Sequence, residues 1–338
     1  MSPPLKPGPQ NHLCDVSGIG VGHAHDASIG TGTSVILPDA RAVAAVDSRG
    51  GGPGTRESDA LRPENLVEEV DAIVLSGGSS YGLAAASGVT DWLGARGRGF
   101  RLRHSPLASP VVPAAILFDL TNGGEKSWGE RSPYSRLGRE AIEMASHANI
   151  SLGNVGAGYG AQAGQYKGGL GSASIITAEG VQVAALMAVN SFGSVVMPDT
   201  ACFWAWPFEQ SAEFGGHPPP TGAVDNLDYV RNTKLDAGLG QNTTIGVVAT
   251  NVALTPVQAR RVAIMAQDGI ARAIRPVHSP VDGDTLFVLA TGAQKLGNPD
   301  FSALSEIGSL AADCVARAIA RGVYEATCLF GMRAYGDN

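Results

Sequence analysis

The sequence predicts a layered α/β sandwich, and three observations lead to this fold class. Short apolar runs bounded by Gly, Pro or Asp recur along the chain, and several are continuous, which is typical of strands covered on both faces. Amphipathic segments of helical period fall between these runs. Glycine is in excess, with 45 residues where average usage gives about 24. Glycine clusters beside apolar runs indicate tight turns and close backbone approaches within a layered fold.

The individual elements follow from the same patterns. Eight short apolar segments are predicted as strands, namely 33–37, 42–46, 72–75, 114–120, 173–177, 181–189, 244–250 and 285–290. Four segments are predicted as helices, namely 81–93, 136–147, 256–274 and 303–320. The helix at 256–274 has a defined start, because Thr255 can cap it and Pro256 suits its first turn.

We expect one domain to hold nearly the whole chain. Residues 1–13 are polar and rich in proline, which predicts a flexible N-terminal arm and leaves 14–338 as a single domain. Within that domain, residues 207–241 carry many polar, Pro and Gly residues and predict a flexible surface loop. The sequence contains no internal repeat.

Composition and charge exclude several classes of partner. The net charge of −7 gives no attraction to nucleic acid or to anionic lipid. No run of 18 apolar residues is present and the N-terminus lacks an apolar signal core, so we expect a cytoplasmic protein. The four cysteines form no CxxC pair, which argues against a zinc ribbon or a redox dithiol. We expect no cofactor and no metal.

Thr243 is the first candidate for chemistry. It follows the polar 207–241 segment and opens a strongly predicted strand. A threonine hydroxyl needs an adjacent base, and the α-amine of an N-terminal threonine, with a pKa of about 7.7–8.0, can be that base. The mechanism therefore requires prior cleavage of the Asn242–Thr243 bond. Taken alone, the segment favours the other interpretation, in which Thr243 is an ordinary β-branched residue at the start of a strand.

The segment 242–251, Asn-Thr-Thr-Ile-Gly-Val-Val-Ala-Thr-Asn, resembles the self-processing segment of the L-aminopeptidase/D-esterase family. That family includes β-peptidyl aminopeptidases and endo-type nylon-oligomer hydrolases. The Asn-Thr junction is similar to the nylon-hydrolase branch, whereas the aminopeptidase branch usually has Gly-Ser. The resemblance covers roughly residues 14–332. It implies a four-layer αββα sandwich that cuts itself into an α-subunit, 1–242, and a β-subunit, 243–338, which stay together.

Asp282 and Asp284 are the second candidate pair. They lie two residues apart, so in an extended segment both carboxylates face the same side, where they can hold the amine or hydroxyl of Thr243. The resemblance implies that they are the polar pair beside the nucleophile. A solvated turn and a weak metal loop are the alternatives, and the spacing does not meet the calcium-loop pattern.

Two further polar residues are candidates. Lys167 lies in a glycine-rich stretch, where its ammonium can approach a developing negative charge. A P-loop is the rival interpretation, and it fails because Gly168 follows the lysine. Asn190 ends an apolar strand and offers an NH₂ donor for an oxyanion, or is simply a turn residue. The resemblance implies a catalytic lysine and asparagine in these two stretches.

A strand, a glycine turn and a helix start follow one another at 75–85. Backbone N–H groups near Gly78 and Ser80 can bind an oxyanion, and no GxGxxG pattern supports a nucleotide loop instead. The resemblance implies that Tyr81 lines the catalytic cleft.

We expect a self-cleaving amidohydrolase or aminopeptidase that uses Thr243. Its substrates would be small peptides, amino-acid amides or esters, or 6-aminohexanoate (nylon) oligomers. Alternatives are an acyltransferase resembling ornithine acetyltransferases and a non-catalytic small-molecule-binding protein. The resemblance also implies a homo-oligomer of processed heterodimers, such as a homotetramer.

Overall fold

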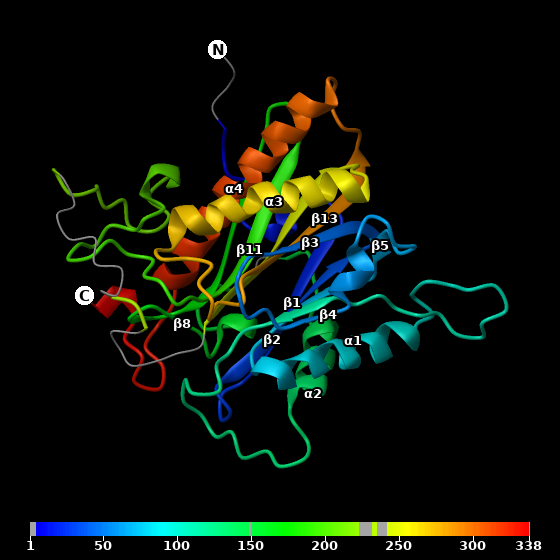
Figure 1. Cartoon of the computed structure of the whole chain (residues 1–338), viewed down its shortest axis with the longest axis horizontal. Coiled ribbons are helices and arrows are strands. Elements are labelled where there is room, and N and C mark those ends of the chain that lie inside the picture. Colours follow the sequence, from blue (N-terminus) through cyan, green and yellow to red (C-terminus); the bar gives the residue numbers. More distant parts are fainter. Residues whose placement is uncertain (1–4, 149, 223–231, 235–241, 338) are drawn as a thin grey trace.

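The protein is built of four layers. A computed structural model describes residues 5–148, 150–222, 232–234 and 242–337. Helices α3 (Pro256–Ala273) and α4 (Asp300–Tyr324) cover one sheet, and α1 (Ala85–Gly94) and α2 (Tyr134–Glu143) cover the other (Figure 1). The two sheets face each other between these helix pairs, which confirms the αββα sandwich.

The sheet beneath α3 and α4 has six strands in the order β10-β11-β12-β13-β3-β5. Their bounds are β10 (Gly169–Ile176), β11 (Gln182–Asn190), β12 (Thr243–Val252), β13 (Thr285–Gln294), β3 (Ala42–Ser48) and β5 (Glu69–Val70). Strands β12 and β13 are parallel, and the other neighbours in this sheet are antiparallel. The start of β12, the start of β13 and the end of β11 therefore lie side by side at the same end of the sheet.

The second sheet has five strands in the order β1-β2-β6-β7-β4. Their bounds are β1 (Ile19–Asp26), β2 (Thr31–Pro38), β6 (Ile73–Ser76), β7 (Ala114–Ile116) and β4 (Thr55–Arg56). A separate short hairpin joins β8 (Gln162–Ala163) and β9 (Tyr166–Lys167). Six 3₁₀ turns are also described, at Leu13–Asp15, Ser58–Leu61, Ser79–Ala84, Gly156–Gly158, Trp206–Phe208 and Tyr335–Asp337.

Three hydrophobic cores separate the four layers. One lies beneath α3 and α4, one between the sheets, and one above α1 and α2. Alternate side chains of β11 enter different cores, with Leu186 between the sheets and Met187 beneath the helices. Both faces of this strand are therefore buried, which explains why its sequence is continuously apolar.

Some of the excess glycines let helices approach the sheets closely. A Cβ at Gly171 on β10 would lie 1.9 Å from the carbonyl oxygen of Ala318 on α4. A Cβ at Gly22 on β1 would lie 1.9 Å from the carbonyl oxygen of Ala141 on α2. Neither position can hold a larger residue unless the helix moves away from its sheet.

Each predicted strand and helix overlaps an observed element, although the ends differ. The start of α3 is as predicted, because Thr255 and Gln258 form a capping box. The predicted helix at 81–93 begins instead as a 3₁₀ turn at Ser79–Ala84. Strand β1 was not predicted, because glycine and histidine interrupt its apolar residues.

The N-terminal segment differs from the expected flexible arm. Within the described residues 5–13, Leu13 is fully buried in the core between the sheets. The side chain of Asn11 donates a hydrogen bond to Glu213 (2.6 Å) and accepts one from Arg317 (2.9 Å). The segment is thus anchored by partners that are distant in sequence, which its local composition does not reveal.

The expected flexible loop at 207–241 also differs where it is described. Phe214 is buried in the core beneath α3 and α4, in edge contact with Phe203. Lys234 is buried as well, with 1% of its surface exposed. Residues 223–231 and 235–241 lie outside the described part of the chain.

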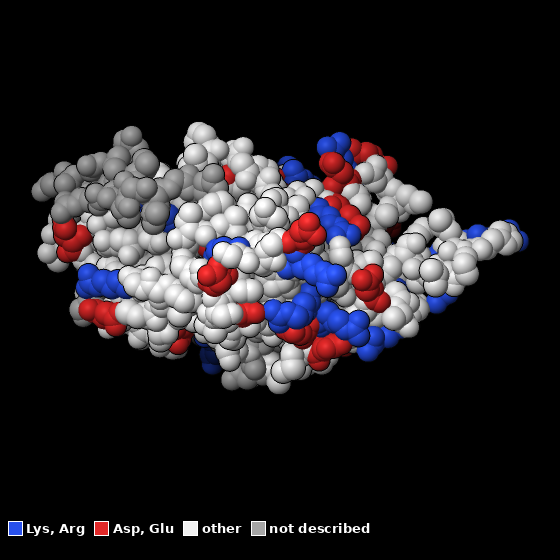
Figure 2. All heavy atoms as spheres, turned by 90° about the horizontal axis from the view of Figure 1, so that it is seen from below, with Lys and Arg blue, Asp and Glu red and all other residues white. Residues whose placement is uncertain are grey.

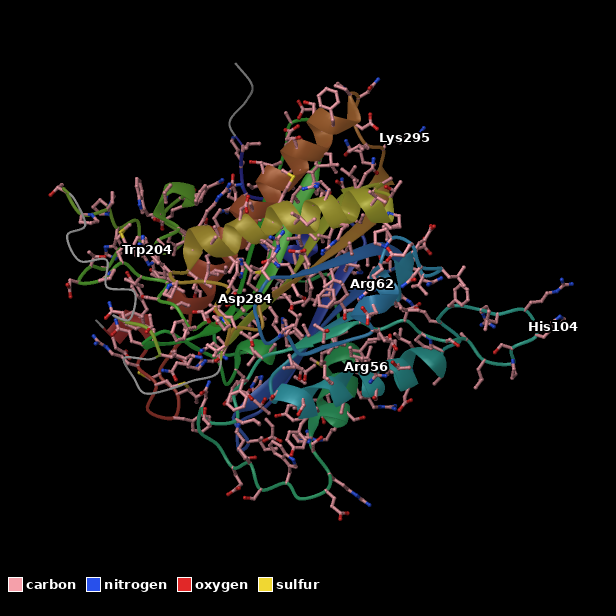
Figure 3. The ribbon with its side chains drawn as sticks, viewed as in Figure 1. Arg56, Arg62, His104, Trp204, Asp284 and Lys295 are labelled. Carbon is pink, nitrogen blue, oxygen red and sulfur yellow. The ribbon has the colours of Figure 1, made fainter. Side chains whose placement is uncertain are left out.

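One face of the molecule carries mixed charge. On the face shown in Figure 2, Lys and Arg lie interspersed with Asp and Glu, so no field of a single sign covers it. A loop between Phe100 and Ser109 projects from the body and carries His104 at its tip (Figure 3). Within the described ranges, no helix is long and apolar enough to cross a membrane.

Candidate active site

A pocket of about 340 Å³ opens where the two sheets meet, and it contains the Asn242–Thr243 junction. Its lining residues are Gly52, Ser79, Ile116, Phe118, Asn242, Thr243 and Val281. Thr243 is the first residue of β12 in one sheet, and Ile116 is the last residue of β7 in the other. Contacts between β12 and β7 hold these two strands together across the sandwich.

The hydroxyl of Thr243 lies against the peptide bond that precedes it. Oγ1 of Thr243 donates a hydrogen bond to the carbonyl oxygen of Asn242. The backbone N–H of Gly283 donates to the same oxygen at 3.1 Å. A Cβ at Gly283 would lie 2.7 Å from Oγ1 of Thr243, so glycine is needed there for the close approach. The nucleophile candidate, the carbonyl and a backbone donor therefore meet at one point.

The two predicted aspartates flank Gly283, and both are buried. Asp284 accepts hydrogen bonds from the Thr244 N–H (2.8 Å) and from Nδ1 of His278 (2.8 Å). Asp282 accepts one from the Ser279 N–H (2.8 Å). Burial raises the pKa of Asp282, and the nearby charge of Asp284 raises this pKa further.

Asn190 is the β-sheet partner of Thr243, since β11 and β12 pair with these two residues opposite each other. Its Nδ2 donates a hydrogen bond to the carbonyl oxygen of Phe118 (2.9 Å), a residue of the pocket wall. Its Oδ1 accepts one from the Gln162 N–H (2.9 Å). The structure thus brings Thr243, Asn190 and the two aspartates together at one end of the six-stranded sheet, where β11 ends and β12 and β13 begin.

Lys167 is fully buried beside this group but does not reach it by a described hydrogen bond. Its Nζ donates to the carbonyl oxygens of Gly158 (3.1 Å) and Gly168 (2.6 Å). Lys167 pairs with Gln162 in the β8–β9 hairpin, and Gln162 in turn holds Asn190. Lys167 is thus connected to Asn190 only through Gln162 in this arrangement, whereas the sequence predicts a direct contact with the reacting groups.

The glycine turn at 77–80 reaches the pocket through Ser79, not through the predicted residues. The Gly78 N–H donates to Oδ1 of Asp119 (2.8 Å), so it is already engaged. Ser80 is exposed, and 52% of the surface of Tyr81 is exposed. The Tyr81 ring packs edge-on against Trp128. Among the described residues, none of these three lines the pocket.

The sequence pattern missed two buried charged residues near the pocket. Asp119 is fully buried and accepts hydrogen bonds from the Gly78 N–H and from the Thr31 hydroxyl (2.6 Å), and burial raises its pKa. Lys234 donates to Asn190. Asp119 lies within the predicted strand 114–120, three residues beyond the observed end of β7, whereas Lys234 carried no sequence signal.

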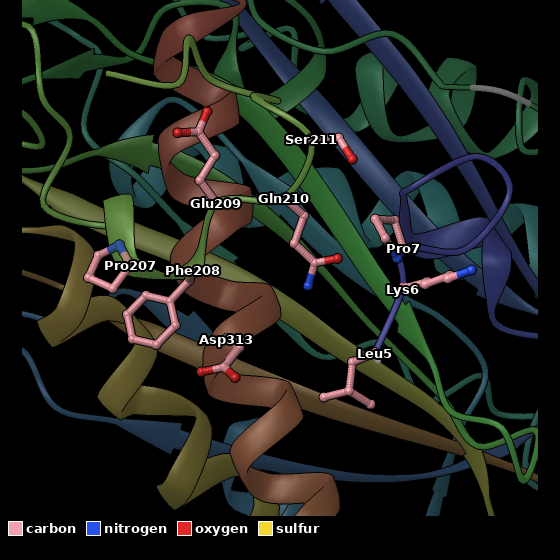
Figure 4. Close-up of a pocket in the computed structure, with 9 residues that line it drawn as sticks. All are labelled: Leu5, Lys6, Pro7, Pro207, Phe208, Glu209, Gln210, Ser211 and Asp313. Carbon is pink, nitrogen blue, oxygen red and sulfur yellow. The ribbon is translucent and has the colours of Figure 1, made fainter. Parts of the chain in front are cut away.

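A larger cavity of about 670 Å³ lies elsewhere (Figure 4). It is lined by Leu5, Lys6, Pro7, Pro207, Phe208, Glu209, Gln210, Ser211 and Asp313. None of the predicted site residues is among them. Asp284, for example, lies away from this cavity, directly before β13 of the six-stranded sheet (Figure 3). The smaller pocket is therefore the candidate site, because it contains the candidate chemistry. In the part of the chain that the structure describes, no three His, Cys, Asp or Glu side chains are grouped to hold a metal ion.

Because Lys167 and Lys234 are buried, we expect the free energy of unfolding to rise with pH above neutrality. Burial lowers the pKa of each lysine from 10.5 to about 7. Between these values the unfolded chain binds more protons than the folded chain, so folding becomes more favourable as pH rises. Urea unfolding between about pH 7 and about pH 9 measures this slope.

The Lys167→Met variant should show a shallower rise than wild type. The exposed Lys295, replaced in the same way, is the control and should keep the wild-type slope. An equal slope in Lys167→Met and wild type would contradict the assignment of the effect to the buried ammonium.

Comparison with known proteins agrees with this site. The profile of Peptidase family S58 matches residues 11–335. An uncharacterized aminopeptidase of Mycobacterium tuberculosis is 43% identical over 344 residues, covering 97% of each chain. The 6-aminohexanoate-oligomer endohydrolase of Kocuria sp. is 29% identical over 285 residues, covering 82% of this chain and 74% of that protein.

Two solved structures share the fold. The beta-aminopeptidase of Burkholderia sp. has a TM-score of 0.71 at 20% identity, covering 100% of this chain and 94% of that chain. The L-aminopeptidase D-Ala-esterase/amidase of Ochrobactrum anthropi, described as a variant of the Ntn hydrolase fold, has a TM-score of 0.70 at 19% identity, covering 96% and 89%. The family resemblance drawn from the sequence is thereby confirmed. With the profile matched over nearly its whole length, the chain belongs to peptidase family S58 and is a hydrolase of amide bonds.

Proposed function

We propose that the chain cleaves its own Asn242–Thr243 bond and then hydrolyses small amides with Thr243 as an N-terminal nucleophile. One observation carries this proposal: the Thr243 hydroxyl lies against the carbonyl of Asn242, within a pocket and beside a backbone donor to that carbonyl. An ordinary strand-opening threonine has no need of a pocket at its own peptide bond.

Self-cleavage proceeds by an N-to-O shift. Oγ1 of Thr243 attacks the carbonyl carbon of Asn242 while the hydroxyl proton passes to a carboxylate of the aspartate pair. The raised pKa of Asp282 suits its carboxylate to accept this proton. The Gly283 N–H stabilises the negative oxygen of the tetrahedral intermediate. The C–N bond then breaks, the nitrogen of Thr243 takes up the proton, and water hydrolyses the resulting ester to a carboxylate on Asn242.

The liberated α-amine then serves as the base for turnover. It accepts the hydroxyl proton as Oγ1 attacks the substrate carbonyl, and it returns the proton to the departing amine. Water hydrolyses the acyl ester and regenerates Thr243. Asn190 lies opposite Thr243 in the sheet and supplies a side-chain N–H donor for the developing oxyanion. Asp284 fixes the start of β12 through the Thr244 N–H.

The pocket and the relatives together support a substrate with an uncharged chain next to the amide. Ile116, Phe118 and Val281 give the pocket apolar walls. The relatives named above are an aminopeptidase and a hydrolase of 6-aminohexanoate oligomers. We therefore propose small peptides, amino-acid amides or esters, and linear 6-aminohexanoate oligomers as the substrate class.

Intact mass spectrometry of the purified protein tests the self-cleavage. We expect two species, residues 1–242 and residues 243–338, which elute together under native conditions. Edman sequencing of the smaller species should begin Thr-Thr-Ile. A preparation that hydrolyses amides while every molecule keeps its full-length mass would rule out the proposed nucleophile.

A further inference from the structure

Lys234 is a buried cation that the sequence did not indicate and that has no role in the proposed mechanism. It precedes the Asn242–Thr243 bond in the chain, and 1% of its surface is exposed. Its Nζ donates hydrogen bonds to both the carbonyl oxygen and Oδ1 of Asn190, each at 3.1 Å. Its backbone N–H donates to the carbonyl oxygen of Phe192 (3.1 Å). Side chain and backbone are thus both tied to the end of β11.

The ammonium of Lys234 completes the set of donors around one oxygen. Oδ1 of Asn190 also accepts from the Gln162 N–H at 2.9 Å and from Nδ2 of Asn122 at 3.2 Å. With three donors on Oδ1, the carboxamide cannot rotate by 180° without breaking all three hydrogen bonds. The Nδ2 group is thereby fixed toward the pocket wall.

The charges of two buried carboxylates favour a positive charge at this position, against the effect of burial. Burial lowers the pKa of Lys234 to about 7, while the charges of Asp282 and Asp119 act to raise it. A cation on the carbonyl oxygen of an amide withdraws electron density from its nitrogen. The N–H groups of Asn190 then become stronger donors toward a negative oxygen.

We propose that Lys234 is a positioning residue that orients and polarises the Asn190 amide for stabilisation of the oxyanion beside Thr243. This inference rests on the proposed function, since it requires Asn190 to face the reacting carbonyl. Lys234 belongs to the segment upstream of the cleaved bond, so the piece 1–242 contributes a group to the site of the piece 243–338.

The test is a double-mutant cycle on the full chain, with L-alanine p-nitroanilide as the probe substrate. Lys234→Met should lower kcat by about 10- to 100-fold, less than the roughly 100- to 1,000-fold cost of losing a direct oxyanion donor. KM should change by less than about two-fold, because the effect is confined to the transition state. The double variant Lys234→Met/Asn190→Ala should be no slower than Asn190→Ala alone, because both act through one amide.

Lys126→Met is the matched control. Lys126 is a less buried lysine on which the charge of Asp119 also acts, but its Nζ donates to the carbonyl oxygen of Ile29. Its kcat should equal that of wild type. Should Lys234→Met fail to fold, Lys234→Gln keeps a donor without the charge and should show the same non-additive loss. Wild-type kcat in the Lys234 variant, or multiplicative losses in the double variant, would overturn the inference. A Thr243→Ala variant that still hydrolyses the probe would instead defeat the proposed function.

Discussion

Replacing Thr243 by alanine is expected to abolish self-cleavage and amide hydrolysis together. The substitution removes the hydroxyl that lies against the Asn242 carbonyl. Loss of a covalent nucleophile costs about 10⁴-fold or more in rate. Only the full-length mass should remain, and release of amine from an amide probe should fall to background.

The neighbouring Thr244 supplies the control for this substitution. It is equally buried, and among the described residues its hydroxyl has no hydrogen-bond partner. Thr244→Val keeps the shape and the backbone N–H to Asp284, so cleavage and turnover should persist. Hydrolysis that survives in Thr243→Ala, or that disappears equally in Thr244→Val, would place the nucleophile elsewhere or make the effect one of packing.

The elements of the fold were predictable because the main strands and helices are marked locally. A strand buried on both faces, such as β11, must be apolar throughout. The start of a helix such as α3 is marked in the sequence by its capping residue, Thr255, and by Pro256. Strand β1 was missed for the opposite reason. The approach of α2 requires Gly22, and glycine weakens the strand pattern.

The candidate site was predictable only as far as strand ends coincide. Asn190, Thr243 and Asp284 could each be identified as candidates from the sequence around them. The β11–β12–β13 order then brings them together at one end of the sheet. The sequence could not place Lys167 or Lys234 relative to them. A lysine in a polar or glycine-rich segment is expected to be solvated. Burial of its ammonium depends on carbonyl oxygens that only the folded chain brings to it, such as that of Gly158 for Lys167 and that of Asn190 for Lys234.

The same limit applies to the segments that were expected to be flexible. Residues 8–15 and 209–216 gain their order from α4, which lies far along the chain. Arg317 on α4 is fully buried and donates to Glu213 through Nε (2.6 Å) and Nη2 (3.0 Å). It also donates to Asn11 and to the carbonyl oxygen of Ser174. One guanidinium therefore links the N-terminal segment, a later loop, a strand of the sheet and a helix.

Arg317→Met is expected to lower the unfolding free energy by about 3–5 kcal/mol, because it removes the closest cation of the buried Glu213 carboxylate and leaves the longer 3.6 Å contact to Arg321. Urea denaturation measures the loss. The exposed pair of Arg136 and Glu140 on α2 is the matched control, and Arg136→Met should cost about 1 kcal/mol or less.

The double variant Arg317→Met/Glu213→Leu separates a charge effect from a packing effect. With both charges removed, much of the lost stability should return, because no buried carboxylate is left without its closest cation. A double variant no more stable than Arg317→Met would show that the hydrogen bonds to Asn11 and Ser174 dominate. Under the proposed cleavage, Glu213 and Arg317 belong to different pieces. Arg317→Met should then also let the two pieces separate at a lower urea concentration, whereas Arg136→Met should not.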